Sequence, residues 1–302
     1  MHNRRMPRIC ALITACDHTS AKLQHCIELL NRQQLKPSDI IIAGCTQDAE
    51  QVRSSIPLHS LPAETGTAAC RAKGMQKAFE ELMADYVWEL EADSAPDETC
   101  LQTLLEAMDK EHKVCLPLSI NTKGNLTFPV FVQHRGKTKL IPDAAELPHA
   151  PQTELAHALP GGLYPRAAWL HVGVPNPALI MQGEWEEYAV RLRAAGFKLY
   201  LVPHATLRYS ATNDYLFYNV GDEPFAYRLG KTLEQHYYLM RNRAWTDRLK
   251  RRTNYLGRLI SCGFYMLNTL CAMLQSGEFS LKRAYLVFRG QHNGFYGKLR
   301  PY

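Results

Sequence analysis

The sequence has 302 residues, enough for one large α/β domain with an appendage, and its hydrophobic share of 46% excludes a disordered chain. Its nine cysteines show no Cys-x-x-Cys spacing, which argues against a disulfide framework and a structural zinc site and favours a reducing compartment. The net charge of +6 is uneven, because residues 241–302 carry +10 and the first 240 carry −4. A basic end on a slightly acidic body indicates an anionic surface as its partner.

The first half of the chain alternates short apolar runs with amphipathic segments. Strands are predicted at residues 9–14, 39–43 and 86–90, and helices at 20–33, 66–83 and 101–108. The first apolar run is too short for a signal peptide and is expected to be the first strand. Strand–helix alternation of this kind builds a parallel sheet with helices on both faces, so the predicted fold class is α/β.

The second half contains fewer regular patterns. Strands are predicted at residues 115–120, 128–132 and 198–202, the last as the final strand, and a helix at 184–195. A polar, proline-rich loop is expected near 142–160, and the Gly- and Pro-rich residues 161–178 are expected to line a site. We predict a catalytic domain at 1–245 and a basic, amphipathic helical region at 246–302.

The C-terminal region contains sixteen uncharged residues, 259–274, which follow Lys250, Arg251, Arg252 and Arg258. This run is shorter than the roughly 20 residues that span a bilayer. Cationic and aromatic flanks around a short apolar helix favour a helix that lies in the membrane interface. A helix packed on the catalytic domain and a spanning helix remain as alternatives.

Two carboxylates, Glu91 and Asp93, directly follow the predicted strand at 86–90. They lie at the carboxyl end of a parallel sheet, which is where ligands bind in open α/β sheets. The intervening residue points away, so both carboxylates can face one cation. Mg²⁺ or Mn²⁺ is held in this way by few protein ligands plus substrate phosphates. The alternative is a solvated loop at the end of the strand.

Three glutamates, Glu184, Glu186 and Glu187, crowd the start of the predicted helix at 184–195. The helix dipole favours acids there for structural reasons alone. The functional alternative is that one of them is a general base, since crowding raises the pKa of a carboxyl group to the range that this role needs.

Small residues from Gly66 to Gly74 lead into another predicted helix. The amides at its N-terminus, together with Arg71, could face a diphosphate. An ordinary helix start is the alternative.

Further segments complete an ordered set. They are Gly44-Cys45-Thr46-Gln47-Asp48, Gly162-Leu163-Tyr164-Pro165-Arg166, Val172-Gly173-Val174-Pro175, Tyr237-Tyr238-x-x-Arg241-Asn242 and Asn293-Gly294-Phe295-Tyr296-Gly297. With the motifs above and in this order, the chain resembles the family-2 inverting glycosyltransferases over residues 9–302. It is most similar to their galactofuranosyl- and rhamnosyltransferase-like branch. The resemblance implies a GT-A fold, which is a nucleotide-sugar-binding, Rossmann-like mixed sheet flanked by helices, here with a basic helical tail.

The resemblance also implies site residues. Donor binding would fall to Thr14, Asp17, Gly44, Asp48, Gly66, Arg71, Glu91 and Asp93; catalysis to Glu184, Glu186 and Glu187; acceptor binding to Gly162, Trp185 and Arg191; and the metal, Mn²⁺ or Mg²⁺, to Glu91, Asp93 and His204. The implied reaction is one in-line displacement, in which a base deprotonates the acceptor hydroxyl and the metal stabilises the leaving diphosphate.

Four positions depart from the family's pattern. Glu91 replaces the first acid of the metal motif, Ala43 the nucleobase-binding aspartate, Trp185 the usual base and Tyr209 a metal-binding histidine, with His204 five residues upstream. They raise a catalytically inactive scaffold protein as the alternative to an enzyme. A nucleic-acid binder is disfavoured by the acidic body and by the apolar run at 259–274.

The expected partners are a nucleotide-sugar donor, a lipid-linked or polysaccharide acceptor of cell-surface glycan synthesis, and an anionic membrane surface. The expected location is cytoplasmic, on the inner face of the cell membrane.

Overall fold

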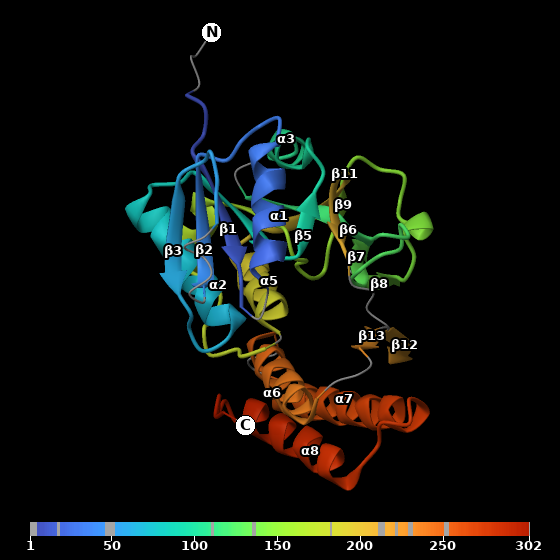
Figure 1. The fold of residues 1–302 in the computed structure, drawn as a ribbon. Helices are drawn as coiled ribbons and strands as arrows, with labels where there is room; N and C mark the ends of the chain where they lie inside the picture. Colours follow the sequence, from blue (N-terminus) through green and yellow to red (C-terminus); the bar gives the residue numbers. More distant parts are fainter. Residues whose placement is uncertain are drawn as a thin grey trace.

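The structure is a computed structural model that describes residues 5–16, 19–45, 52–109, 112–134, 137–181, 183–210, 215–220, 223–228, 232–250 and 254–301. A nine-stranded mixed sheet forms its centre (Figure 1). The strand order is β3 (Leu58–Pro62), β2 (Asp39–Cys45), β1 (Ile9–Thr14), β4 (Tyr86–Glu91), β10 (Leu163–Pro165), β6 (Lys113–Asn121), β11 (Lys198–Tyr209) and β5 (Ser94–Pro96), with β9 (Thr153–Glu154) also paired to β11. β10, β5 and β9 run antiparallel to their neighbours and the other pairs are parallel.

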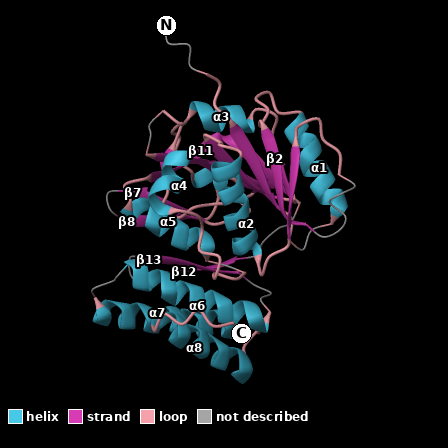
Figure 2. Cartoon of the chain, turned by 90° about the vertical axis from the view of Figure 1, so that its left-hand side faces the viewer, coloured by secondary structure: helices cyan, strands magenta, loops and turns pink. Residues whose placement is uncertain are grey.

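The sheet is buried on both faces because its strands are apolar at consecutive positions. In β1, Ile9, Ala11 and Ile13 point to one core and Cys10 and Leu12 to the other. The first core is covered by α1 (Ser20–Asn31) and α3 (Cys100–Glu106), and the second by α2 (Thr67–Gln76), α4 (Arg166–Val172) and α5 (Glu184–Ala194) (Figure 2). Continuous apolar strands of this kind are typical of parallel sheets with helices on both sides.

The predicted α/β class is confirmed, and most predicted elements lie within a few residues of the observed ones. The helix predicted at 66–83 ends at Gln76 and continues as a π-helical turn at Lys77–Glu81. The strand predicted at 198–202 extends to Tyr209, beyond a register shift between Val202 and Thr206.

Strand 198–202 is also not the final strand, because a hairpin of β12 (Tyr215–Val220) and β13 (Glu223–Arg228) follows it. Strands β5, β9 and β10 were not predicted, since two or three residues are too few to show a period of two. The predicted strand at 128–132 corresponds to β7 (Val130–His134), which forms a second hairpin with β8 (Lys137–Ile141). A 3-10 turn lies at Ala144–Glu146 within the expected loop.

Three helices, α6 (Leu233–Lys250), α7 (Tyr255–Gln275) and α8 (Leu281–Phe295), form the C-terminal part of the chain. α6 lies between the sheet domain and the other two (Figures 1 and 2). α8 approaches α6 closely because Gly290 and Gly294 place no side chain against the backbone carbonyls of Tyr237 and Arg241. Residues 245 and 246, between which the predicted division falls, both lie inside α6, and the division into two domains stays a prediction.

α7 contains the predicted uncharged run. One side of this helix packs on α6 and α8, where Tyr265, Ala272 and Met273 meet Met240 and Val287. Its other side is exposed. Among the described residues, no helix has both the length and the apolar character needed to cross a bilayer.

Candidate functional site

A buried arginine, Arg71 of α2, joins three carboxylates that come from two other elements. Its Nε lies 2.7 Å from Glu89 Oε1 and its Nη1 lies 2.7 Å from Glu184 Oε1. Its Nη2 lies 3.5 Å from Glu91 Oε1. β4 supplies Glu89 and Glu91, and the first turn of α5 supplies Glu184. We call Arg71, Glu89, Glu91 and Glu184 the Arg71 cluster, and it lies at the carboxyl ends of β1 and β4, where Thr14 is in register with Glu91.

Glu89 is the deepest member of the Arg71 cluster and is fully buried. Its Oε2 accepts a hydrogen bond from the Gly161 amide at 3.2 Å, and Thr14 Oγ1 lies 3.5 Å from its Oε1. Only glycine fits this position well, because its φ of +89° is strained for other residues and a Cβ would collide with the Pro117 ring. Sequence analysis missed Glu89 as a site residue, although a carboxylate inside an apolar strand requires a partner.

Trp185 covers the guanidinium of Arg71. The Arg71 Cζ lies 4.2 Å from the centre of the indole ring, and the indole stacks on Tyr164 with the ring centres 6.0 Å apart and the planes at 9°. A guanidinium over an indole is attracted by the ring's negative face. The indole at this position therefore stabilises the arginine that Glu184 binds.

The Arg71 cluster places three carboxyl groups around one guanidinium, so it carries an excess of negative charge when all are ionised. Burial raises the pKa of Glu91 to about 7, with Glu89, Asp93 and Glu184 adding to the rise and Arg71 opposing it. Burial also raises the pKa of Glu184, again against Arg71. Glu91 is thus poised to gain or lose a proton close to neutral pH, and the same cause shifts Glu184 in the same direction.

Glu91 and Asp93 are the predicted metal ligands. Their side chains are 30% and 15% exposed, and Asp93 Oδ2 lies 3.9 Å from Lys22 Nζ. Tyr209 is buried nearby, and its pKa is raised well above the usual value by burial and by Glu91, Glu89 and Asp93. Over the described ranges, no three His, Cys, Asp or Glu side chains cluster closely enough to hold a metal. Two carboxylates at a sheet edge fit a cation that takes its other ligands from a bound diphosphate.

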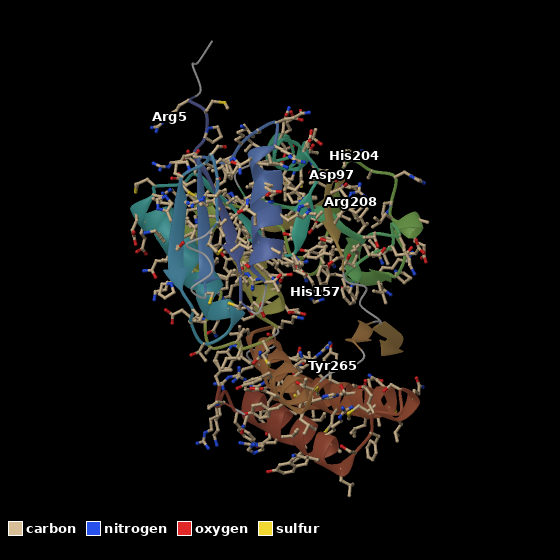
Figure 3. The ribbon with its side chains drawn as sticks, viewed as in Figure 1. Arg5, Asp97, His157, His204, Arg208 and Tyr265 are labelled. Atoms are coloured by element: carbon tan, nitrogen blue, oxygen red, sulfur yellow. The ribbon has the colours of Figure 1, made fainter. Side chains whose placement is uncertain are left out.

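His204, the third predicted ligand, does not join Glu91 and Asp93. It is exposed on β11 within the register shift between Val202 and Thr206. Figure 3 shows it beside Asp97 and Arg208, near the edge strand β5. Tyr209 holds the position next to the carboxylates instead.

Glu187 and Arg191 pair with each other along α5. Arg191 Nε lies 2.7 Å from Glu187 Oε1, and the guanidinium also donates to the carbonyl oxygens of Val172 and Val174. This pair fastens α5 to the loop after α4, and neither residue contacts Arg71. Glu186 is exposed in the first turn of α5 and makes no hydrogen bond or ion pair within the described part of the chain.

The predicted glycines adopt backbone shapes that bring chain segments together. Gly44 has a φ of +88° and leaves room for Cys16 and Cys70, whose sulfur atoms lie 3.2 Å apart. Gly66, with a φ of +93°, is the N-cap of α2, and Gly162 packs against the Tyr164 ring. Asp17 and Asp48 lie outside the described residues.

The segment that leads into Glu184 is held by α6. Arg241 Nη2 donates to the Ala178 carbonyl at 2.7 Å, and Asn242 Nδ2 donates to the Ile180 carbonyl at 3.0 Å. Gly183 has a φ of +92° and lies against the Asn242 side chain. The C-terminal helices therefore position the start of α5, and with it one carboxylate of the Arg71 cluster.

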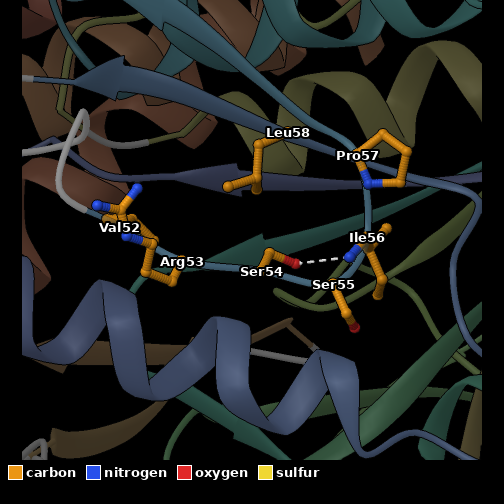
Figure 4. A pocket seen from close by; sticks show the side chains of 7 residues that line it. All are labelled: Val52, Arg53, Ser54, Ser55, Ile56, Pro57 and Leu58. Carbon is orange, nitrogen blue, oxygen red and sulfur yellow. Dashed lines mark hydrogen bonds between the residues drawn. The ribbon is translucent and has the colours of Figure 1, made fainter.

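A pocket of about 450 Å³ lies along the segment between β2 and β3 and is lined by residues 52–58 (Figure 4). This segment is tied to α1, since Asn31 Oδ1 accepts from Ser55 Oγ at 2.6 Å and Gln24 Oε1 accepts from the Arg53 amide at 3.0 Å. None of its lining residues belongs to the Arg71 cluster, and it contains no carboxylate. It is not the predicted site.

No family model and no curated protein matches the chain. Among solved structures, it is similar to GalNAc-T7 with UDP, GalNAc and Mn²⁺, at 14% identity and a TM-score of 0.56 over 82% of this chain and 50% of that one. It also matches S. aureus TarS 1–349 in complex with UDP, at 13% identity and a TM-score of 0.48 over 80% of this chain and 65% of that one. The chain thus spans half of the GalNAc-T7 chain. The likeness to GalNAc-T7 shows the GT-A fold and so confirms the predicted fold.

Proposed function

We propose that the chain is an inverting glycosyltransferase that moves a sugar from a nucleotide donor to an acceptor hydroxyl. The observation that carries this proposal is the Arg71 cluster, which gathers carboxylates from β4 and α5 at the carboxyl edge of a GT-A sheet. GalNAc-T7, which has the same fold, binds UDP and Mn²⁺. The predicted donor residues Thr14, Gly44 and Gly66 lie near this edge and stay predictions, as do Asp17 and Asp48. The Arg71 guanidinium is fully buried and engaged by three carboxylates, so it is not free to face a diphosphate as the sequence suggested.

Glu91 and Asp93 would hold a divalent cation, Mn²⁺ or Mg²⁺, together with the donor diphosphate. When bound, the cation neutralises negative charge on the leaving diphosphate. Glu91 remains partly exposed for this purpose. Arg71 lies beside Glu91 but does not neutralise it fully, because the guanidinium also pairs with Glu89 and Glu184.

Metal-dependent UDP binding is expected to tighten from pH 6 to pH 8. Glu91, with its pKa raised to about 7, is mostly protonated at pH 6, and a proton on the carboxyl group competes with the cation. The ionised fraction rises about tenfold over this range, which sets the largest expected change in the dissociation constant. Calorimetric titration of UDP with Mn²⁺ measures it. Glu91→Gln should bind more weakly and with little pH dependence, whereas an unchanged pH profile in that variant would contradict the role of Glu91.

We propose Glu184 as the general base. Its Oε1 is fixed by Arg71, its pKa is raised by burial, and it stands at the N-terminus of α5 beside the donor edge. A base is most effective when its pKa approaches the working pH. Glu184→Gln is expected to lower kcat about 10²–10⁴-fold with little change in donor affinity. The matched control is the exposed Glu186→Gln, which should retain most of the rate; the reverse order of the two effects would assign the base to Glu186.

The acceptor would contact the exposed part of Trp185, whose side chain is half-buried. Gly162 lies beside Tyr164, on which this indole stacks, so Gly162 and Trp185 stay in the proposed acceptor region. Arg191 is engaged by Glu187 and by two carbonyl groups, which supports a structural role for it. We propose a lipid-linked or polysaccharide acceptor of cell-surface glycan synthesis, met at the cytoplasmic face of the membrane.

A donor screen tests the function directly. Selective thermal stabilisation by one nucleotide sugar, followed by transfer with inverted anomeric configuration, is the expected result. Failure of every common nucleotide sugar to stabilise the protein or to be consumed would refute the proposal.

A catalytically inactive scaffold of a glycan-assembly complex is the second candidate. It is favoured by Trp185, which stands at the usual base position and covers Arg71, and by the guanidinium that already faces Glu91. Tight donor binding that does not depend on Mn²⁺ and is followed by no turnover would support the scaffold. Turnover that is lost in Glu184→Gln would exclude it.

Asn242→Ala is expected to reduce the transfer rate while sparing most of the stability. The substitution removes the hydrogen bond to Ile180 and the contact with Gly183, so the start of α5 gains freedom and Glu184 spends less time in place. We expect a fall in kcat of about tenfold and a loss of stability of about 1–2 kcal/mol. Thr232→Ala is the control: it removes the hydrogen bond that Thr232, just before α6, accepts from the Gln235 amide, far from the segment before Glu184 in the chain, and its kcat should stay at the wild-type value.

A further inference from the structure

We propose that the outer sides of α7 and α8 form one docking surface for an anionic lipid bilayer. We further propose that this surface holds the Arg71 cluster near acceptors anchored in the same bilayer. The second half of this proposal rests on the proposed transferase function, and the first half does not. We call the surface the α7–α8 face.

The α7–α8 face consists of large apolar side chains at helical spacing. On α7 it comprises Leu256, Ile260, Phe264 and Leu267, which are 51–65% exposed. On α8 and its C-cap it comprises Leu281, Tyr285, Phe288 and the cap residue Tyr296, which are 54–83% exposed. Steps of three and four residues bring such side chains to one side of a helix. The opposite sides of both helices are already packed against α6, so these residues remain for an external partner.

This exposure is confined to one part of the molecule. Of the sixteen large hydrophobic side chains that are exposed among the described residues, twelve lie between Tyr255 and Tyr296. The remaining four, Met6, Met83, Leu170 and Met181, are scattered over the sheet domain. Scattered apolar residues are normal on a protein surface, whereas a contiguous apolar patch marks an interaction site.

Charge decides which partner fits. Residues 246–302 contain two acids: Asp247 is buried and bonded to Ser261, and Glu278 lies 3.4 Å from Arg283. The exposed cations of this part of the chain include Lys282, Lys298 and Arg300, and the described residues of α7 and α8 contain no exposed acid. A second copy of this chain would bring like charges together, while anionic lipid headgroups complement them and the acyl region receives the apolar side chains.

The position of the face connects it to the catalytic edge. Figure 1 shows α6, α7 and α8 on the side of the sheet domain toward which the carboxyl ends of β2 and β3 point, with α5 next to α6. α6 links the two through Arg241 and Asn242, which hold the segment before Glu184. A bilayer under the α7–α8 face thus lies on the same side as the Arg71 cluster. The matching acceptor class is a glycan whose lipid anchor is embedded in that bilayer.

Flotation with lipid vesicles tests the docking surface. The full chain is expected to float with vesicles of phosphatidylcholine and phosphatidylglycerol at 70:30 and to bind vesicles of phosphatidylcholine alone at least tenfold more weakly. The double variant Phe264→Glu/Phe288→Glu changes one exposed side chain on each helix and should lose at least tenfold of the binding. The control Met83→Glu/Leu170→Glu changes two equally exposed side chains of the sheet domain and should bind as the wild type does.

Three outcomes would overturn the proposal: no binding of the wild type to anionic vesicles, equal binding by both double variants, or a wild-type dimer in solution that the Phe264→Glu/Phe288→Glu variant dissociates. The Phe264→Glu/Phe288→Glu variant should bind UDP as tightly as the wild type does. This measurement separates the docking surface from the transferase function. If vesicle binding holds but no sugar is transferred by the wild type, the transferase proposal fails and the docking surface stands. If the variant transfers sugar to a vesicle-embedded acceptor as fast as the control does, the lipid-anchored acceptor is refuted.

Discussion

Replacing Arg71 by methionine is expected to lower the free energy of unfolding by about 3–5 kcal/mol, because removal of one partner leaves buried charges uncompensated. Glu89 and Glu184 are 0% and 5% exposed and both lie 2.7 Å from Arg71 nitrogens, so neither carboxylate can turn to water without disturbing β4 or α5. Urea unfolding of the wild type and the variant at pH 8 measures the loss.

The pH dependence of that loss identifies its cause. Arg71 opposes the burial that raises the pKa of Glu184, so the variant should raise this pKa further. A carboxyl group whose pKa is higher in the folded than in the unfolded state destabilises the fold when it is ionised. This destabilisation disappears as the pH falls through the folded-state pKa to the pKa of the unfolded state. The gap between wild type and variant should therefore be smaller at pH 5 than at pH 8. Arg71→Met/Glu89→Gln/Glu184→Gln should recover part of the loss, and an equal gap at both pH values would show that the arginine acts only through packing.

Replacing Asp93 by alanine is expected to abolish sugar transfer, by at least about 10³-fold, while the fold stays intact. The carboxylate would be needed for the cation and the diphosphate, and its Oδ2 lies 3.9 Å from Lys22 Nζ. Transfer rates with Mn²⁺ and thermal midpoints of the same samples measure the two effects separately.

Asp97→Ala is the matched control for Asp93→Ala. Asp97 lies four residues after Asp93, directly after β5, and pairs with the exposed Arg208 at 3.0 Å. The Asp97→Ala variant should transfer sugar at nearly the wild-type rate, because the exposed ion pair between Asp97 and Arg208 contributes little to stability and is not part of the proposed donor site. Normal transfer by Asp93→Ala would refute the metal assignment, and a joint loss of transfer and of the fold would mean that Asp93 supports the structure.

Local patterns in the sequence were sufficient to predict the central strands and helices. The apolar runs at residues 9–14 and 39–43 and the amphipathic segment after Ser20 each contain enough residues to show their period. The three-residue strands β5 and β10 contain too few residues to show a period. β5 is a strand because it pairs with β11, and β10 is a strand because it pairs with β4 and β6. Sheet partners that lie far away in sequence decide such elements.

The candidate site was predictable in part for the same reason. The spacing of Glu91 and Asp93 after a strand is a local signal, and so is the crowding of glutamates at the start of α5. The partnership of Arg71 with Glu89 and Glu184 is not local, because it joins residues 18 and 113 positions apart. No local signal separates Glu187, which pairs with Arg191 four residues along the helix, from Glu184, which faces Arg71.

The two glycines where α8 meets α6 limit how the protein can be shortened. Gly290 and Gly294 bring α8 against the carbonyls of Tyr237 and Arg241, and Tyr237 and Arg241 in turn donate to the carbonyl of Arg300 at 3.0 Å and 2.8 Å. A chain cut before residue 246 would strip α6 of these neighbours and expose its apolar side. A shortened protein should therefore keep all three helices, because α6 holds the segment before Glu184. Replacing exposed apolar side chains of α7 and α8 by charged ones is the better way to make the protein more soluble.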